Sequence, residues 1–334
     1  IGGSLQIFKR NGVFLDTGVH YVGSLGKGEV LNNILSFVSG LDRIDLIQLD
    51  SKGFDRLIFH NESSFEFKIP NGLDNYFQQL LEYFPSEQVA ISDYIEMLRD
   101  VINSTPLFNL LPSPKDMISK WRTVGLKDFF KSINASEKLI KVLLGNNLLY
   151  AAHPDQTSVY SHALVVLSFL NSAWRIPGGS HKIAQNLARE IKSNGGRIYN
   201  LHTVKRIHAD SNIITYVETH NGERFYSDQF ISTIGLKQTF SIIENSSLRA
   251  SYLNKYKDSI HSISAFTMHL FTDYESPDVN HYNRYHFFDS NIWTGKTYDN
   301  SNWPNNILEY TFHSQRDHQK VISIMSAMSF DECK

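Results

Sequence analysis

The sequence predicts a two-lobe α/β protein, and three observations support that prediction. The chain has 334 residues, which is enough to bury two medium-sized hydrophobic cores. Its apolar pattern changes from strand-like to helical near Pro70 and returns to short strands near Pro177. Glycine-rich turns join the short extended pieces of both strand-like parts, as expected where the backbone must reverse tightly.

The composition excludes several classes of protein. The 32 basic and 34 acidic residues nearly cancel, so no electrostatic footprint for nucleic acid is present. The high aromatic content argues against a disordered chain. The single cysteine, Cys333, rules out a disulfide framework or a cysteine-based metal site and fits a reducing compartment. No run approaches the ~20 apolar residues of a membrane span. We therefore expect a cytoplasmic location and leave peripheral membrane contact open.

Residues 1–69 predict short strands and one helix. Lys9 to Gly12 carries a hairpin signal between apolar residues, because Asn-Gly favours the turn that joins two paired strands. Apolar residues at helical spacing predict a helix from about 28 to 37,. Three further strands are expected at 44–49, 55–60 and 64–69.

Residues 73–173 are predicted to be mostly helical. Apolar faces recur at helical spacing over 76–84, 89–101, 126–133, 139–149 and 157–174,. Five helices in a row with no strand between them predict a separate helical insert.

The pattern returns to strands after Pro177. Ser180 is a candidate N-cap for the next helix, and Asn194 to Gly196 supplies a left-handed stop,. Strands are expected at 197–201, 204–209, 213–219, 224–226 and 229–234, with two more at 265–271 and 307–312.

Two glycine elements could approach a phosphate. Gly2 and Gly3 form the first, and the run from Asp16 to His20 forms the second. Glycines let the main chain approach a pyrophosphate with no side chain in the way. Taken alone, each element fits an ordinary turn better than a phosphate site.

Three ordered blocks resemble the phytoene desaturase / retinol saturase family of FAD-dependent oxidoreductases. The first runs from Gly2 to Gly23 and resembles a Gly-Gly hairpin followed by F-D-T-G-x-H-Y-x-G, with Leu15 as one extra residue. The second, Trp174 to Ala188, resembles the P-x-G-G-S turn and its helix. The third combines 194–198, 203–207 and 230–235. The resemblance covers about residues 1–270.

The resemblance implies an incomplete FAD-binding, Rossmann-like lobe from 1–40 and 175–245. It also implies an α+β substrate lobe from 41–174 and 246–334, with the helical insert. The cofactor would then be bound by residues from both glycine elements and from the third block, which are Gly2, Gly3, Ser4, Gly18, Val19, His20, Val204, Thr233, Ile234 and Gly235. Without the family context, Val204 fits an ordinary strand core residue better than a cofactor contact.

The chain departs from the family pattern in two places. The Gly-x-Gly-x-x-Gly unit and the acidic residue for the ribose are not in this sequence, and neither is the glycine-rich closing segment,. We therefore expect a larger parent protein to bind FAD, and this chain alone to retain no FAD and to be inactive. The parent is expected to oxidise or reduce carbon–carbon double bonds in a long apolar polyene, such as a carotenoid, or in another isoprenoid. An amine-oxidase-like flavoenzyme and a non-catalytic apolar-ligand-binding domain are the alternatives.

Catalytic residues are not identified by the sequence. No Ser-His-Asp or Cys-His set and no paired carboxylates can be recognised, and flavin chemistry belongs to the cofactor. His20 and Tyr21 are the polar residues we expect nearest a flavin. The spacings of His281, His286, His313 and His318 fit no metal motif,, so no metal site is predicted. The aromatic tail lines either an apolar tunnel or a plain sheet core; its residues are Tyr282, Tyr285, Phe287, Phe288, Trp293 and Trp303.

Overall fold

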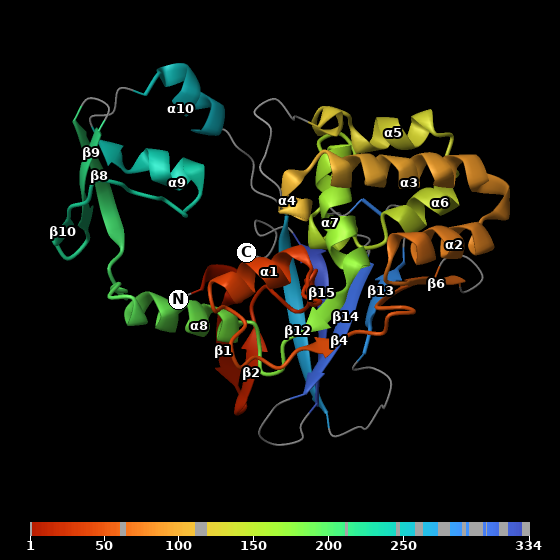
Figure 1. Ribbon diagram of the computed structural model, residues 1–334, viewed down its shortest axis with the longest axis horizontal. Helices are drawn as coiled ribbons and strands as arrows, with labels where there is room; N and C mark the ends of the chain where they lie inside the picture. The colour runs from red at the N-terminus through yellow and green to blue at the C-terminus, as the bar shows by residue number, and fades with distance from the viewer. Residues whose placement is uncertain are drawn as a thin grey trace. The chain divides into compact units, whose positions relative to one another are not determined.

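The computed structural model is a mixed α/β structure that divides into two compact units (Figure 1). The first unit comprises Ile1–Glu190 and Ile263–Lys334, and the second comprises Ile191–Ser262. The structure describes residues 2–60, 65–110, 119–210, 213–244, 248–257, 263–272, 281–288, 292–293, 303–304, 306–313 and 320–328. Each unit has its own sheet. The division into a cofactor lobe and a substrate lobe, with the boundaries given above, remains a prediction.

A six-stranded sheet forms the centre of the first unit. Its order is β12-β15-β14-β13-β5-β6, and every neighbouring pair is antiparallel except β13 and β5. The predicted strands at 55–60, 64–69, 265–271 and 307–312 are confirmed within a residue or two. The bounds are β5 Asp55–Phe59, β6 Phe65–Ile69, β12 Ser264–Thr272, β13 Asn283–Phe287, β14 Asn306–His313 and β15 Lys320–Met328.

A hairpin precedes the sheet, as the Asn-Gly signal predicts. Strands β1 (Ile7–Arg10) and β2 (Val13–Asp16) pair antiparallel. Asn11 and Gly12 both have positive φ, 47° and 82°, which is the backbone a type I′ turn requires. The inner residues Val13 and Leu15 are buried and pack with Val321 of β15, so the hairpin rests against the C-terminal strands.

A layer of helices shares one hydrophobic core with the strands. Figure 1 shows these helices gathered beside the sheet, and α7 packs against α2, α3 and α5. The helical insert therefore exists, but it belongs to the same compact unit as the strands around it. The bounds of these helices are α2 Leu73–Tyr83, α3 Gln88–Asn103, α4 Pro106–Asn109, α5 Leu126–Ser132, α6 Glu137–Leu143 and α7 Val159–Asn171. Helix α1 (Val30–Phe37) precedes them in the chain and has no buried residue. No described helix is long and apolar enough to cross a bilayer.

The helix predicted at 157–174 ends earlier in the structure. Helix α7 stops at Asn171, and β7 (Ala173–Arg175) follows as a strand. Its backbone pairs with β3 (Val22–Gly23) on one side and β4 (Ile47–Gln48) on the other. Pairing with two strands distant in sequence overrides the local helical pattern, because it satisfies the backbone groups of all three segments.

The second unit holds a four-stranded sheet with the order β10-β9-β8-β11. Helix α8 (His181–Ser193) leads into it and ends as predicted, with Gly195 at φ 81°. The predicted strands at 197–201 and 229–234 are wrong: both segments lie outside the strands of the described sheet. Ile231 in the second segment is 91% exposed. An apolar pattern typical of a strand therefore does not form a strand when no neighbouring strand pairs with it. The bounds are β8 Val204–Asp210, β9 Ile213–Thr219, β10 Arg224–Phe225, α9 Leu236–Ser241, β11 Ile243–Glu244 and α10 Ala250–Lys257.

Candidate cofactor and substrate site

Six of the ten predicted cofactor residues belong to the first unit, and Gly2, Ser4 and Gly18 lie close together there. Gly2 has φ 104°, and a Cβ at this position would lie 2.9 Å from the Cβ of Ala184 in the first turn of α8. A Cβ on Gly18 would lie 3.2 Å from the carbonyl oxygen of Ser4. The glycines therefore allow the segment 2–4 to lie between α8 and the turn after β2.

Gly3 differs from Gly2 and Gly18 in the space around it. Its φ is 52°, yet a Cβ built on it would meet nothing within 4 Å. The main chain is thus exposed to open space at this one point. A backbone with this access fits the close approach of a pyrophosphate, which the resemblance assigns to Gly2 and Gly3.

Asp16 connects the hairpin to the start of α8. Its Oδ1 accepts hydrogen bonds from the backbone N–H and from the hydroxyl of Ser180, both at 3.1 Å. Burial raises the pKa of Asp16, while the two Ser180 hydrogen bonds lower it less strongly. Ser180 therefore donates to Asp16 at the helix start, and this contact holds the second glycine element beside α8.

His20 is a neutral, partly buried imidazole with one nitrogen left over. Its ring stacks on Tyr310 with centroids 4.3 Å apart, and its Nε2 lies 3.4 Å from the Tyr310 hydroxyl. Its Nδ1 is buried and has no hydrogen-bond partner. Burial lowers the pKa of His20 to about 4, with smaller effects from His269 and Arg175. An orphaned buried nitrogen at this position fits the edge of a bound ring, as expected for a flavin.

Tyr21, the residue after His20, lies in a buried polar network of the core. Its hydroxyl donates to Asp55 Oδ2 at 3.0 Å and lies 2.7 Å from the Tyr285 hydroxyl. Asn283 Nδ2 donates to the other oxygen of Asp55 at 2.7 Å, and Arg175 donates to Asn283 Oδ1 at 2.6 Å. Tyr21 therefore anchors the backbone of His20 instead of facing a ligand.

This network is not predicted from the sequence, although the sequence carries one signal for it. Asp55 opens a strand whose alternate residues, Leu57 and Phe59, are buried, so period-two alternation places its carboxyl on the core side. Burial raises the pKa of Asp55 to about 7 and lowers that of Arg175 to about 10. The partners Arg175 and Asn283 come from distant segments and could not be paired with it by spacing.

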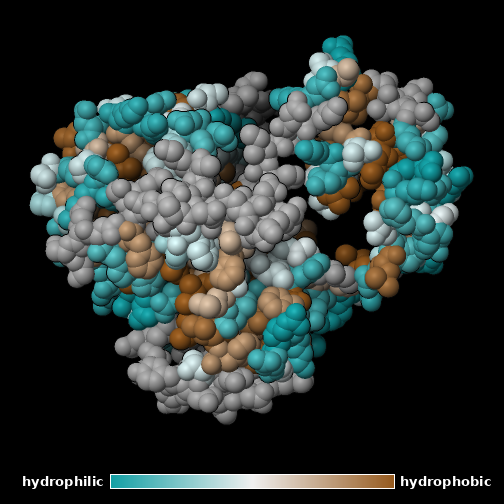
Figure 2. Space-filling model, turned by 180° about the vertical axis from the view of Figure 1, so that it is seen from behind, coloured by the Kyte–Doolittle hydropathy of each residue, from teal (hydrophilic) through white to brown (hydrophobic). Residues whose placement is uncertain are grey.

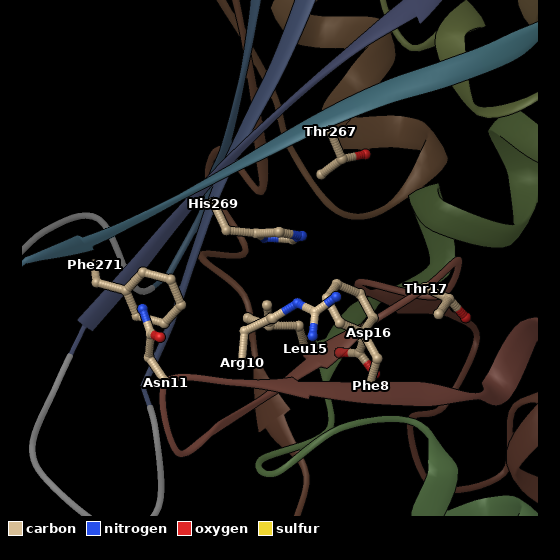
Figure 3. A pocket seen from close by; sticks show the side chains of 9 residues that line it. All are labelled: Phe8, Arg10, Asn11, Leu15, Asp16, Thr17, Thr267, His269 and Phe271. Atoms are coloured by element: carbon tan, nitrogen blue, oxygen red, sulfur yellow. The ribbon is translucent and has the colours of Figure 1, made fainter. Parts of the chain in front are cut away.

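A pocket of about 520 Å³ opens between the hairpin and the edge strand β12 (Figure 3). Figure 3 shows side chains from both elements extending into this space. Three of the lining residues are apolar, and the others carry polar or charged groups. They are Phe8, Arg10, Asn11, Leu15, Asp16, Thr17, Thr267, His269 and Phe271.

The pocket is connected to His20 through its wall. His269 Nδ1 lies 2.8 Å from the Ser323 hydroxyl, and Ser323 is hydrogen-bonded to Tyr310, on which His20 stacks. Phe8 packs edge-on against the His269 ring at 5.7 Å. Burial also lowers the pKa of His269. A series of contacting polar side chains thus leads from His269 in the pocket wall to His20, where we expect the flavin.

The remaining predicted cofactor residues lie in the second unit. Val204 opens β8, and Thr233, Ile234 and Gly235 come just before α9. The Gly235 carbonyl accepts the N–H of Thr239 at 2.9 Å and so begins that helix. Val19, from the first unit, adjoins His20 in the turn after β2. That all ten residues contact one cofactor remains a prediction.

The aromatic tail is mainly core. Tyr282, Tyr285 and Phe287 are at most 4% exposed and line the sheet, which favours the sheet-core interpretation over a tunnel. His286 contacts His60 and Glu309; His318 and the side chain of His313 lie outside the described residues. Among the described residues, no group of three or more His, Cys, Asp or Glu is placed to hold a metal ion.

Fold and site together define a mixed α/β protein of the FAD-dependent oxidoreductase type. The model of the family described as flavin containing amine oxidoreductase matches residues 1–311. The chain belongs to this family.

Curated relatives and solved structures agree with this assignment. The chain is 30% identical over 231 residues to all-trans-retinol 13,14-reductase of Rattus norvegicus, covering 63% of the chain and 37% of the relative. It is 27% identical over 264 residues to the Homo sapiens protein of that name, covering 72% and 42%. It therefore spans about two-fifths of their length.

Solved structures of similar fold include an oxidoreductase from Methanosarcina mazei, with a TM-score of 0.67, 15% identity and coverage of 99% of this chain and 72% of that one. Putrescine oxidase bound to putrescine has a TM-score of 0.59, 12% identity and coverage of 100% and 69%.

Proposed function

We propose that the protein acts on carbon–carbon double bonds of a long apolar molecule, such as a polyene or another isoprenoid. The observation that carries this proposal is the pocket beside the His20 element. Phe8, Leu15 and Phe271 give it apolar walls, and its volume of about 520 Å³ is typical of a small-molecule site. The similarity to retinol reductases supports the same class of substrate.

The cofactor in this proposal is FAD, which supplies hydride transfer when it is bound. The chain's own residues have simpler tasks. Gly3 leaves room for the pyrophosphate, and the bond between Asp16 and Ser180 fixes the hairpin against α8. His20 stays neutral on Tyr310, and its unpaired Nδ1 would be available to the flavin ring. Phe8, Leu15 and Phe271 would contact the apolar body of the substrate.

The charges of the pocket argue against an amine as substrate. Arg10 is a fixed cation among the lining residues, and a protonated amine would be repelled by it. Asp16 is the one described carboxyl of the lining; its pKa is raised by burial, and its Oδ1 is already bonded to Ser180. The one described carboxyl of the lining is therefore already engaged on one oxygen, and a fixed cation lies in the same lining.

The test uses the protein expressed from its whole reading frame and supplied with FAD. The protein is incubated separately with a polyene and with an alkyl diamine, with dithionite as the reductant or air as the oxidant. The masses of the products are determined by mass spectrometry. The proposal expects the polyene to gain or lose two hydrogens while the diamine is unchanged. Hydrogen peroxide and aldehyde from the diamine, with an unaltered polyene, would establish the amine-oxidase alternative instead.

We also propose that the chain as given does not retain FAD. Contacts to charged phosphates contribute about 1.5–3 kcal/mol each, and the glycine unit that makes most of them in such folds is not in this sequence,. Purified chain is expected to show no flavin absorbance band. A band near one flavin per chain would contradict this proposal.

A further inference from the structure

The inner face of the hairpin carries one residue that does not match the rest. Register pairs Phe8 with Leu15 and Arg10 with Val13, and alternation places these four residues on one face. Val13 and Leu15 are each 1% exposed in the small core with Val321. Arg10 is therefore a cation on a face that is otherwise apolar.

Arg10 extends into the pocket from this face. Figure 3 shows its side chain reaching into the space between the hairpin and β12, toward His269. It is exposed at the pocket mouth, so its guanidinium stays hydrated while the pocket is empty. No ion pair with a described carboxylate satisfies it, Asp16 included. A guanidinium placed this way can exchange its water for an anionic group.

Asp16 is the one carboxyl among the other described polar groups around the pocket, and no ion pair joins it to Arg10. Thr17, Thr267 and Asn11 are neutral, and burial holds His269 mainly in its neutral form. Asp16 is engaged by Ser180. The pocket thus combines apolar walls made by Phe8, Leu15 and Phe271 with one cation at its mouth.

We propose that this pocket binds an amphipathic molecule with an apolar body and a carboxylate end, and that Arg10 recognises the carboxylate. Arg10 is then a specificity-determining residue. The inference deepens the proposed function and rests on it for the apolar body of the ligand. Arginine suits this role because its planar fork matches a carboxylate with two parallel hydrogen bonds.

The chain supplies its own matched control. Lys9 is the adjacent cation on the same strand, but it lies on the opposite face, where its Nζ is 5.5 Å from the centre of the Phe14 ring. A Lys9→Gln change alters the net charge by the same amount as Arg10→Gln without touching the pocket. Any difference in binding between the two variants therefore reflects where the removed charge lies and not the change in net charge.

The experiment measures binding of decanoate and of decan-1-ol to the full chain by titration calorimetry, below the concentration at which either self-associates. The probes share one apolar chain and differ in their end group. Wild type is expected to bind decanoate at least tenfold more tightly, which corresponds to ~1.4 kcal/mol. Arg10→Gln should abolish this preference, Arg10→Lys should keep part of it, and Lys9→Gln should keep all of it. Thermal unfolding checks that each variant is folded.

Three results would overturn the inference: equal binding of both probes by wild type, no binding of either, or equal losses in Arg10→Gln and Lys9→Gln. The binding measurement needs neither flavin nor turnover. A negative result would therefore refute the carboxylate site without refuting the proposed function. A carboxylate preference in a protein that leaves polyenes unchanged would refute the function and keep the site. Polyene turnover without a preference would refute the site alone.

Discussion

The imidazole of His20 is stacked on the phenol ring of Tyr310, with the two planes inclined by 26°. This contact joins a glycine-rich turn near the start of the chain to a strand almost 300 residues later. It also keeps His20 away from water, and burial is the main cause of its lowered pKa,.

The stacked pair predicts how the pKa of His20 responds to substitution. Tyr310→Phe keeps the ring and the burial, so the pKa of His20 should stay near 4. Tyr310→Leu opens the site to water, and the pKa should rise toward the ordinary value of 6.5. Histidine NMR titration of both variants measures this. Equal pKa values in the two variants would show that stacking has no part in the shift.

Asp55 predicts a loss of stability as pH rises. Its carboxyl has a pKa of 3.8 unfolded and about 7 in the folded chain, so the folded state binds its proton more tightly. The contribution of Asp55 to the free energy of unfolding is fully present below pH 3.8. It is lost progressively toward pH 7, by an amount on the order of a few kcal/mol. Denaturant unfolding of wild type and Asp55→Asn across this range measures the difference. An identical pH dependence in both would contradict the assignment.

Burial of His162 should make the folded protein less stable as pH falls, which is opposite to the effect of Asp55. Removing the hydroxyl of either hydrogen-bond partner of His162 should also lower stability. His162 is buried among the helices, and its two ring nitrogens lie 2.8 Å from the Tyr94 hydroxyl and 2.7 Å from the Tyr150 hydroxyl. Burial lowers its pKa to about 3, so stability is lost as pH falls from 6.5 toward 3. Tyr94→Phe and Tyr150→Phe should each cost about 1–3 kcal/mol, because each leaves one ring nitrogen unpaired. Unfolding free energies at neutral pH check this, and a neutral effect of both changes would refute it.

Two adjacent glycines should respond differently to alanine. Gly2→Ala puts a Cβ 2.9 Å from Ala184 at a positive φ, which should destabilise the fold by about 2 kcal/mol or more. Gly3→Ala meets no atom within 4 Å, so only backbone strain of about 1–2 kcal/mol is expected. In the protein from the whole reading frame, Gly3→Ala should nevertheless weaken FAD binding strongly. A Gly3→Ala protein that binds FAD as wild type does would show that the cofactor passes elsewhere.

Local patterns predicted most of the elements. The Asn11–Gly12 turn specified its hairpin because few other residue pairs accept two positive φ angles,. The strand Asp55–Phe59 and the helix Gln88–Asn103 each carry their own periodicity,. Such elements depend on neighbours close in sequence, and the sequence therefore contains their signal.

Long-range pairing could not be predicted in the same way. The helical pattern near Trp174 yields to β7, whose partners lie about 125 to 150 residues earlier in the chain. Ile231 has the apolar pattern of a strand but lies outside the described sheet. The network of Asp55, Arg175 and Asn283 likewise exists only after three distant segments meet. The glycines were accessible to sequence analysis because a family resemblance marked them.

The family resemblance predicts that the glycine elements and the residues before α9 bind one flavin. Hydrogen exchange of the protein from the whole reading frame, with and without FAD, tests it most directly. FAD is expected to slow exchange at Gly3–Ser4, Gly18–His20 and Thr233–Gly235 together, while exchange in the core helix Gln88–Asn103 is unchanged. Flavin bound at full occupancy with unaltered exchange in all three segments would contradict it.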